Sequence, residues 1–129
     1  MKKGIIFGAF DLLHPGHVYT LKECRKLCEW LIVGLHVDPS NERKTKNKPA
    51  ESVFGRYIRL SGCRYVDQII PYETSQDLVD MLEMVDVDVR FVGGDYLDHP
   101  ERMVGGDIVP VKYVSREHNY SSSILRKSL

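Results

Sequence analysis

Two histidines stand three residues apart in the stretch "FGAFDLLHPGHVYTLKECRKL", residues 7–27. His14 and His17 flank Pro15 and Gly16, between an apolar run and a segment with helical spacing, so we expect them where a helix begins. The N–H groups of a first helical turn lack intrahelical partners and carry partial positive charge, which favours a bound anion. Imidazole N–H groups donate to phosphate oxygens, and Gly16 lets a phosphate approach the backbone. The pair therefore indicates a phosphate site, suited to phosphoryl or nucleotidyl transfer.

Two other roles are open for this histidine pair. Zinc needs three or four ligands, and His36, His99 and His118 show no paired spacing. The alternative without a ligand is a pair of ordinary polar residues at a helix start. The first turn lacks both G-x-G-x-x-G and G-x-x-x-x-G-K-[ST], which argues against a dinucleotide site of the usual type and against a P-loop.

Strands and helices are predicted to alternate along the chain. Strands are expected over residues 4–9, 30–37, 66–72, 87–93 and 108–114. Helices are expected over residues 17–29, 53–62, 75–85 and 121–127, with Ser75 as the N-cap of the third. This order favours the α/β fold class, a single-domain Rossmann-like three-layer sandwich with a five-stranded parallel sheet. Ligands of such sheets bind beyond the carboxyl ends of the strands, so the loops beginning near residues 9, 38, 93 and 115 are expected to form the site.

Two of the expected helices have a defined face. In the first, the residues at helical spacing are Val18, Leu21, Cys24, Leu27 and Cys28. In the second, the residues that share one face are Phe54, Tyr57, Ile58 and Ser61. The first pattern predicts an amphipathic helix, and the second supports a helix over residues 53–62.

The composition is that of an ordinary globular protein. Of 129 residues, 43% are hydrophobic and 28% are charged, and 18 basic residues balance 18 acidic ones. This balance implies no general attraction to nucleic acid or membranes, and no apolar run approaches the roughly 18 residues of a membrane span. Cys24, Cys28 and Cys63, an odd number without a signal peptide, are typical of thiols in a reducing compartment, with the close pair buried. We therefore expect a soluble, cytoplasmic protein.

A basic loop follows the second expected strand. It lies between Pro39 and Pro49, and its cationic residues are Arg43, Lys44, Lys46 and Lys48. Side chains two residues apart in an extended segment point to the same side, so Lys44 and Lys46 are predicted to face the site together. Such a loop could close over a triphosphate, whereas the alternative is a solvated basic loop.

The end of the chain, "SREHNYSSSILRK", offers further anion partners. Arg116 could hold a phosphate bidentately, and the N–H and hydroxyl groups of Ser121, Ser122 and Ser123 would lie where a helix begins. Simple helix capping is the alternative for these serines. Three elements suited to anions are thus expected at one edge of the sheet.

The order of these motifs resembles a known superfamily. "GAFDLLHPGH" is similar to the first motif of nucleotidyltransferases with an H-x-G-H signature, and "RYVDQIIPY" and the serine-rich end match the same group. The chain is most similar to the cytidylyltransferases that make CDP-glycerol from CTP and glycerol 3-phosphate. The resemblance spans nearly all of residues 1–129 and implies one nucleotidyltransferase domain that transfers CMP from CTP to a small phosphate monoester.

The resemblance also implies roles for individual residues. The catalytic residues would be His14, His17, Lys44, Lys46 and Arg116. The nucleotide would be bound by Gly8, Ala9, Phe10, Gly16, Arg64, Asp95, Tyr120, Ser121, Ser122 and Ser123. The acceptor would be bound by Asp11, Asp38 and Lys44. Mg²⁺ is expected as the CTP complex with no assigned protein ligand, and a homodimer is expected, with neither nucleic acid nor membrane as a partner.

The chain departs from this family in three places. Ala9 stands where the family has threonine, "REHNYSS" replaces R-T-E-G-I-S-T, and "YETSQDL" lacks the lysines found in glycerol-phosphate enzymes. These departures bear on the acceptor and on the base more than on the transfer chemistry. An adenylyltransferase on the same scaffold and a non-catalytic nucleotide-binding module are the alternative functions.

Overall fold

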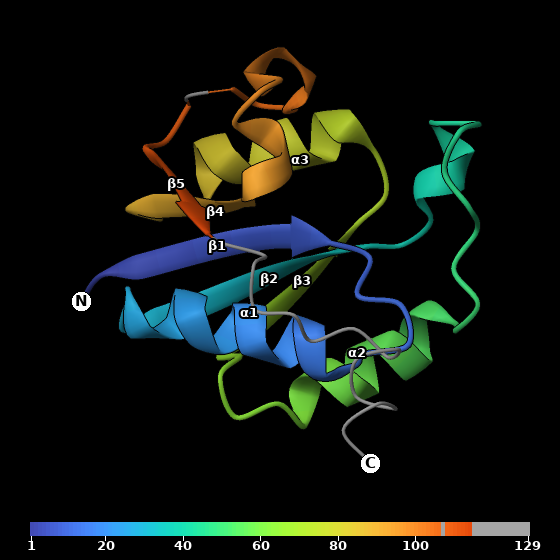
Figure 1. Ribbon diagram of the computed structural model, residues 1–129, viewed down its shortest axis with the longest axis horizontal. Coiled ribbons are helices and arrows are strands. Elements are labelled where there is room, and N and C mark those ends of the chain that lie inside the picture. Colours follow the sequence, from blue (N-terminus) through green and yellow to red (C-terminus); the bar gives the residue numbers. More distant parts are fainter. Residues whose placement is uncertain (107, 115–129) are drawn as a thin grey trace.

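The computed structural model describes residues 1–106 and 108–114, and these residues form a five-stranded parallel sheet in the order β3-β2-β1-β4-β5 (Figure 1). The strands are β1 (Lys3–Gly8), β2 (Trp30–His36), β3 (Gln68–Tyr72), β4 (Val89–Gly93) and β5 (Val111–Val114). The α-helices are α1 (Pro15–Lys26), α2 (Val53–Ser61) and α3 (Ser75–Met84). The predicted fold class is confirmed. Within the described residues, no helix combines the length and apolarity needed to traverse a bilayer.

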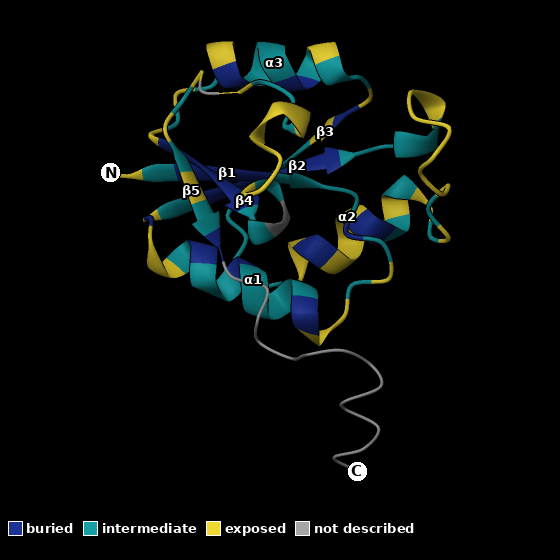
Figure 2. Ribbon diagram, turned by 45° about the horizontal axis from the view of Figure 1, so that its top comes forward, coloured by how far each residue is buried: buried dark blue, intermediate teal, exposed yellow. Residues whose placement is uncertain are grey.

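Helices cover both faces of the sheet, as Figure 1 shows. On the face of α1 and α2, Leu21 and Leu60 pack in a cluster with Val33 and Phe91. On the face of α3, Leu78 and Leu82 pack with Ile5, Ile32 and Tyr72. The strands between these layers are nearly continuous apolar runs, because a parallel sheet covered on both faces leaves no side for polar residues. Figure 2 shows the buried centre of the sheet between partly exposed helices.

The chain reverses direction across the sheet at β1. It moves from β1 through β2 to β3, and then returns through α3 to β4 on the other side of β1. Right-handed crossovers in the two directions place α1 and α2 on one face and α3 on the other. The loops after β1 and β4 consequently run to opposite faces of the sheet at its carboxyl edge, and folds of this kind bind ligands in the crevice between such loops.

Several boundaries differ from those predicted. Helix α1 begins at Pro15 rather than at residue 17, because proline fits the first position of a helix. The N-cap of α3 is Thr74, whose hydroxyl accepts from the Asp77 N–H at 3.0 Å. Strand β5 begins at Val111, after Pro110. The loop after β4 holds the 3₁₀ turns η2 (Gly94–Tyr96) and η3 (Pro100–Arg102), as the loop after β2 holds η1 (Pro39–Asn41). The predicted helix 121–127 lies outside the described residues.

Helix α2 turns its apolar residues outward. Phe54 is 73% exposed and Ile58 is 51% exposed, and Tyr57 on the same face is also exposed. The side facing the core carries Leu60 and the charged Arg56, which is only 2% exposed. The sequence pattern identified residues that share one face of α2, but the opposite face packs against the core. Arg56 can be buried on that face because backbone carbonyls accept its hydrogen bonds.

The close pair of cysteines lies in the interior as predicted. Cys24 and Cys28 are buried on α1 and just after it, and neither forms a disulfide. Burial raises the pKa of the Cys24 thiol to about 12. Cys63 is a partly exposed free thiol.

Candidate active site

A cavity of about 640 Å³ opens at the carboxyl edge of the sheet. One end is formed by the loop after β1 and the start of α1, through Ala9, Phe10, His14, Gly16 and His17. The basic loop after β2 borders it with Arg43, Lys46 and Asn47. The other end reaches the face of the sheet that α3 covers. The cavity therefore continues across the sheet edge from the histidines toward β3, β4 and α3.

The two histidines cap α1 for each other. The Gly16 N–H donates to His14 Nδ1 at 3.0 Å, and the His14 N–H donates to His17 Nδ1 at 3.2 Å. This is a capping box built from imidazoles in place of the usual serine and glutamate. The rings stack with centroids 3.9 Å apart and planes 29° apart. The sequence predicted the place of the pair but not this reciprocal cap.

The cap fixes which ring nitrogen carries the proton. Each Nδ1 accepts a backbone N–H, so a neutral imidazole must hold its proton on Nε2. His14 and His17 both line the cavity. The arrangement supplies two stacked imidazole donors at the positive end of a helix, which suits a phosphate whose negative charge grows during reaction. Donation in this form does not require protonated imidazoles.

The loop between β1 and α1 has an unusual backbone. Phe10 and Leu12 have φ angles of 49° and 48°, in the left-handed region that residues other than glycine seldom adopt. The Phe10 ring is buried and lies edge-on to His17, with centroids 5.6 Å apart. Strain of this kind persists only where surrounding contacts hold it, and it gathers at functional sites.

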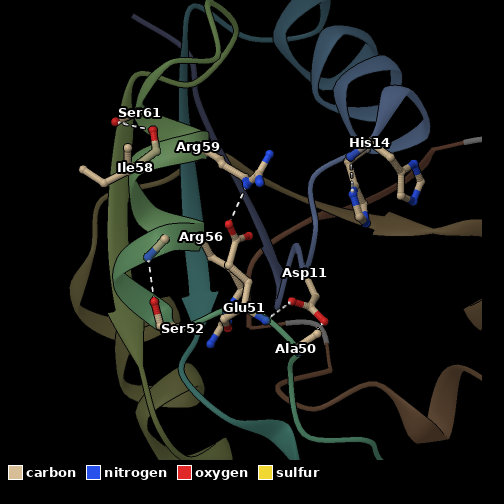
Figure 3. Close-up of polar contacts among 11 residues, drawn as sticks. Asp11, His14, Ala50, Glu51, Ser52, Arg56, Ile58, Arg59 and Ser61 are labelled. Carbon is tan, nitrogen blue, oxygen red and sulfur yellow. Dashed lines mark hydrogen bonds and ion pairs between the residues drawn. The ribbon is translucent and has the colours of Figure 1, made fainter.

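One of those contacts comes from Asp11, between the two strained residues. The N–H of Ala50 donates to one Asp11 oxygen at 2.8 Å, and the N–H of Glu51 donates to the other at 3.0 Å (Figure 3). These donors hold the pKa of the Asp11 carboxyl below its usual value. Asp11 thus joins the histidine loop to the end of the basic loop, and its side chain does not line the cavity.

Arg56 of α2 also connects these two loops, through hydrogen bonds to their backbone carbonyls. Its Nη1 donates to the carbonyl of Ala9 at 3.1 Å and to that of His36 at 2.6 Å. Its Nη2 donates to the Val37 carbonyl, and its Nε donates to the Glu51 carbonyl at 3.1 Å. Burial lowers the pKa of the guanidinium, which stays charged because free arginine is so basic. Arg56 is not among the predicted site residues, because a single arginine in a helix has no distinctive spacing in the sequence.

The basic loop is turned rather than extended. The Lys46 N–H donates to the Arg43 carbonyl at 2.9 Å, so these two residues, three apart, both reach the cavity. Lys44 does not line it, and the prediction that Lys44 and Lys46 share one side of an extended segment is therefore wrong. The loop is fastened to α3 by Glu42, whose carboxylate accepts from the Ser75 N–H at 3.0 Å and from its hydroxyl at 2.6 Å.

The remaining predicted site residues have different positions. Asp38 caps η1 by accepting from the Ser40 N–H at 2.9 Å, and it does not line the cavity. Arg64 lies between α2 and β3, at the amino edge of the sheet, with its guanidinium 5.8 Å from the Tyr65 ring centroid. Gly8 does line the cavity. The predicted residues that lie outside the described part of the chain are Arg116, Tyr120, Ser121, Ser122, Ser123 and the side chain of Asp95.

The far end of the cavity contains residues that the sequence analysis did not select. His36 and Tyr72 stack with ring centroids 4.5 Å apart, and burial lowers the pKa of His36. Arg90, on β4, also borders this end, together with Tyr96. Among the described residues, His, Cys, Asp and Glu form no group of three that could hold a metal ion, so zinc gains no support there.

Comparison with known proteins places this site in a family. A family model described as cytidylyltransferase-like matches residues 5–128. The chain belongs to the cytidylyltransferase-like family. This confirms the resemblance inferred from the "GAFDLLHPGH" motif, and it places the capped histidine pair inside the matched region.

Relatives in this family differ in length. Glycerol-3-phosphate cytidylyltransferase of Staphylococcus aureus is 33% identical over 129 residues, which cover 100% of this chain and 96% of that protein. Bifunctional protein HldE of Hyphomonas neptunium is 37% identical over 113 residues, which cover 87% of this chain but only 23% of HldE. The structure of a lipopolysaccharide core biosynthesis protein from Thermoplasma volcanium matches with a TM-score of 0.69 and 26% identity, covering 89% of this chain and 95% of that one.

Proposed function

We propose that this protein is a CTP-dependent cytidylyltransferase that transfers CMP to a small phosphate monoester, either glycerol 3-phosphate or a related polyol or sugar phosphate. The reciprocal cap of His14 and His17 carries the proposal, because it places two imidazoles side by side in the wall of one cavity and makes Nε2 the donor atom of each. Membership of the cytidylyltransferase-like family and the full-length similarity to a glycerol-3-phosphate cytidylyltransferase support CTP and this class of acceptor.

The reaction is an in-line displacement at the α-phosphorus of CTP. An oxygen of the acceptor phosphate forms the new P–O bond, the bond to the β-phosphate breaks, and pyrophosphate leaves. A phosphate dianion is already a nucleophile, so no general base has to remove a proton. The Nε2–H groups of His14 and His17 and the first turn of α1 stabilise the charge that develops on the α-phosphate oxygens.

The rest of the triphosphate would lie against the basic loop. Arg43 and Lys46 border the cavity on that side and offer opposite charge to the β- and γ-phosphates. CTP would enter as its Mg²⁺ complex, and the ion would supply further positive charge to the triphosphate. In the loops after β1 and β2, the carboxylates of Asp11, Asp38 and Glu42 already accept backbone N–H groups, which fits an ion carried by the nucleotide.

Pyrophosphate release is the direct test of this proposal. Purified protein should release pyrophosphate from CTP only when a phosphate monoester is present, and should do so more slowly with ATP at the same concentration. A preference for ATP would favour the adenylyltransferase alternative. Nucleotide binding without pyrophosphate release from any acceptor in a panel of polyol and sugar phosphates would favour the non-catalytic module.

The basic loop gives a prediction with a matched control. Lys46→Ala should raise the KM for CTP about tenfold, because a charged hydrogen bond to the triphosphate is lost. Lys44→Ala removes the same charge from the same loop but from a side chain outside the cavity, so its effect on CTP should be smaller. The family resemblance implies that Lys44 binds the acceptor, in which case Lys44→Ala raises the KM of the acceptor, and the same kinetic series tests this. Melting temperatures should barely change for either variant. Wild-type kinetics in both lysine variants would show that the basic loop is solvated and does not bind the substrates.

We also propose that the chain forms a homodimer, as the family resemblance implies. The exposed apolar face of α2, with Phe54 and Ile58, is the surface that a second copy would cover. Sedimentation at micromolar concentration should show a species of twice the 14.8 kDa chain mass. Phe54→Ser should weaken the dimer, whereas Met84→Ser, which alters an even more exposed apolar residue on α3, should not. A species of monomer mass alone in the wild type would contradict the proposal.

A further inference from the structure

Arg90 is a charged residue in the interior of the sheet. It is the second residue of β4, where its neighbours Val89, Phe91 and Val92 are all buried, and it is itself only 6% exposed. Burying a cation is costly unless a partner compensates for the lost hydration. None of the carboxylates whose side chains the structure describes forms an ion pair with it. An anion that could compensate for the buried charge of Arg90 is therefore absent from the described residues.

The chain satisfies this guanidinium only in part. Nη1 donates to the carbonyl of Val104, while Nε is buried without a hydrogen-bond partner among the described residues. The guanidinium carbon lies 5.1 Å from the centroid of the Phe7 ring, which gives a cation–π contact but accepts no directed hydrogen bond. A residue serving only to hold the loop at Val104 would not require a fixed positive charge.

The backbone around Arg90 is shaped to admit its head group. Gly105 has a φ angle of 88°, and a Cβ there would lie 3.2 Å from Nη1 and 2.7 Å from a methyl of Leu82. Only glycine allows the loop to pass this close in that conformation. The loop 103–106 thus encloses one side of the guanidinium, and the other side borders the cavity.

The sheet separates Arg90 from the phosphate site of the histidines. Arg90 pairs in register with Ile5 and stacks with Phe7, and both of these pack on the face that α3 covers. Helix α1 and its capping histidines belong to the opposite face. A ligand that spans the cavity would therefore place its reacting phosphate near the histidines and its other end near Arg90.

We propose that Arg90 recognises a second anionic group, a carboxylate or a second phosphate, at the end of the acceptor remote from its reacting phosphate. This inference rests on the proposed function and narrows the acceptor to phosphate monoesters with an acidic tail. Leu78 and Val104 make the surrounding walls apolar, which strengthens the attraction between the two charges. Tyr72 and Tyr96 border the same end and can donate hydroxyl groups to the same anion.

Three acceptor probes that differ only at the tail test this proposal. Glycerol 3-phosphate has a neutral tail, 3-phosphoglycerate carries a carboxylate, and glycerol 1,3-bisphosphate carries a second phosphate. Calorimetric binding without CTP should show that wild-type protein binds at least one acidic probe about 10- to 100-fold more tightly than glycerol 3-phosphate, the range expected of a charge-assisted hydrogen bond. Which acidic probe binds more tightly identifies the anion.

Variants at Arg90 separate recognition from structure. Arg90→Gln should reduce the preference for the acidic probe to about threefold or less, and Arg90→Lys should retain part of it, since the charge remains without the planar fork. Circular dichroism checks that both variants are folded, and the wild-type preference stands as evidence even if one is not. Equal binding of all three probes by the wild type, or binding of none, overturns the proposal. Pyrophosphate release with glycerol 3-phosphate at undiminished efficiency would then leave the cytidylyltransferase function intact.

Discussion

Replacing His14 or His17 by alanine should lower kcat about 10²–10³-fold, the usual cost of removing one donor to a transition-state oxygen. Each ring offers its Nε2–H because its Nδ1 accepts a backbone N–H, so each variant removes one donor and disturbs one cap. Steady-state pyrophosphate release with saturating CTP and an accepted phosphate monoester measures the loss. The double variant should lose less than the product of the two single effects, because the rings orient each other.

The cap itself supplies the control for this prediction. Asparagine is among the best N-cap residues, so His14→Asn should recover most of the stability that His14→Ala loses, about 1 kcal/mol, without recovering kcat. Melting curves and kinetics on the same samples compare the three proteins. If His14→Asn restored turnover together with stability, the histidines would be helix caps only, as the ligand-free alternative holds.

The architecture was predictable because burial leaves a strong pattern. The runs that form β1 and β2 are almost entirely apolar, and the polar segment between β2 and α2 could only be a loop. The histidine spacing likewise located the helix start to within two residues. Such features depend on residues that are close together in the sequence, so the local pattern is enough to predict them.

The rest of the site depends on residues far apart in the sequence. Arg56 reaches carbonyls of residues 9, 36 and 37, and Arg90 borders a loop that begins more than ten residues later. Lys44 and Lys46 diverge because a turn at Arg43 replaces the extended backbone that the alternation assumed. A charge in an apolar strand, as at Arg90, was the one sequence signal that could have identified a missed residue.

Arg56→Met should destabilise the protein on the order of 3 kcal/mol, because four carbonyl oxygens lose a charged donor in the interior. Methionine keeps much of the side-chain length and apolar stem, so the change removes the hydrogen bonds rather than the packing. Chemical denaturation of the variant and the wild type measures the difference. Arg56→Lys should fall between them, since an ammonium can reach only some of the same carbonyls.

Arg56→Met should also lower kcat, because Arg56 positions the loops of the site although it does not contact the substrates. Arg56 does not line the cavity. Its Nη atoms nevertheless hold the Ala9 carbonyl, where the histidine loop begins, and the carbonyls at the end of β2, where the basic loop begins. Arg59→Met is the matched control, because Arg59 lies on the same helix but its half-exposed side chain pairs with the Glu51 carboxylate rather than with loop carbonyls (Figure 3). Solvent screens the half-exposed Arg59 end of this pair, so the control should lose less stability and less turnover than Arg56→Met. An Arg56→Met variant as stable as the control would show that the four carbonyls find water instead, and that the loops do not depend on this arginine.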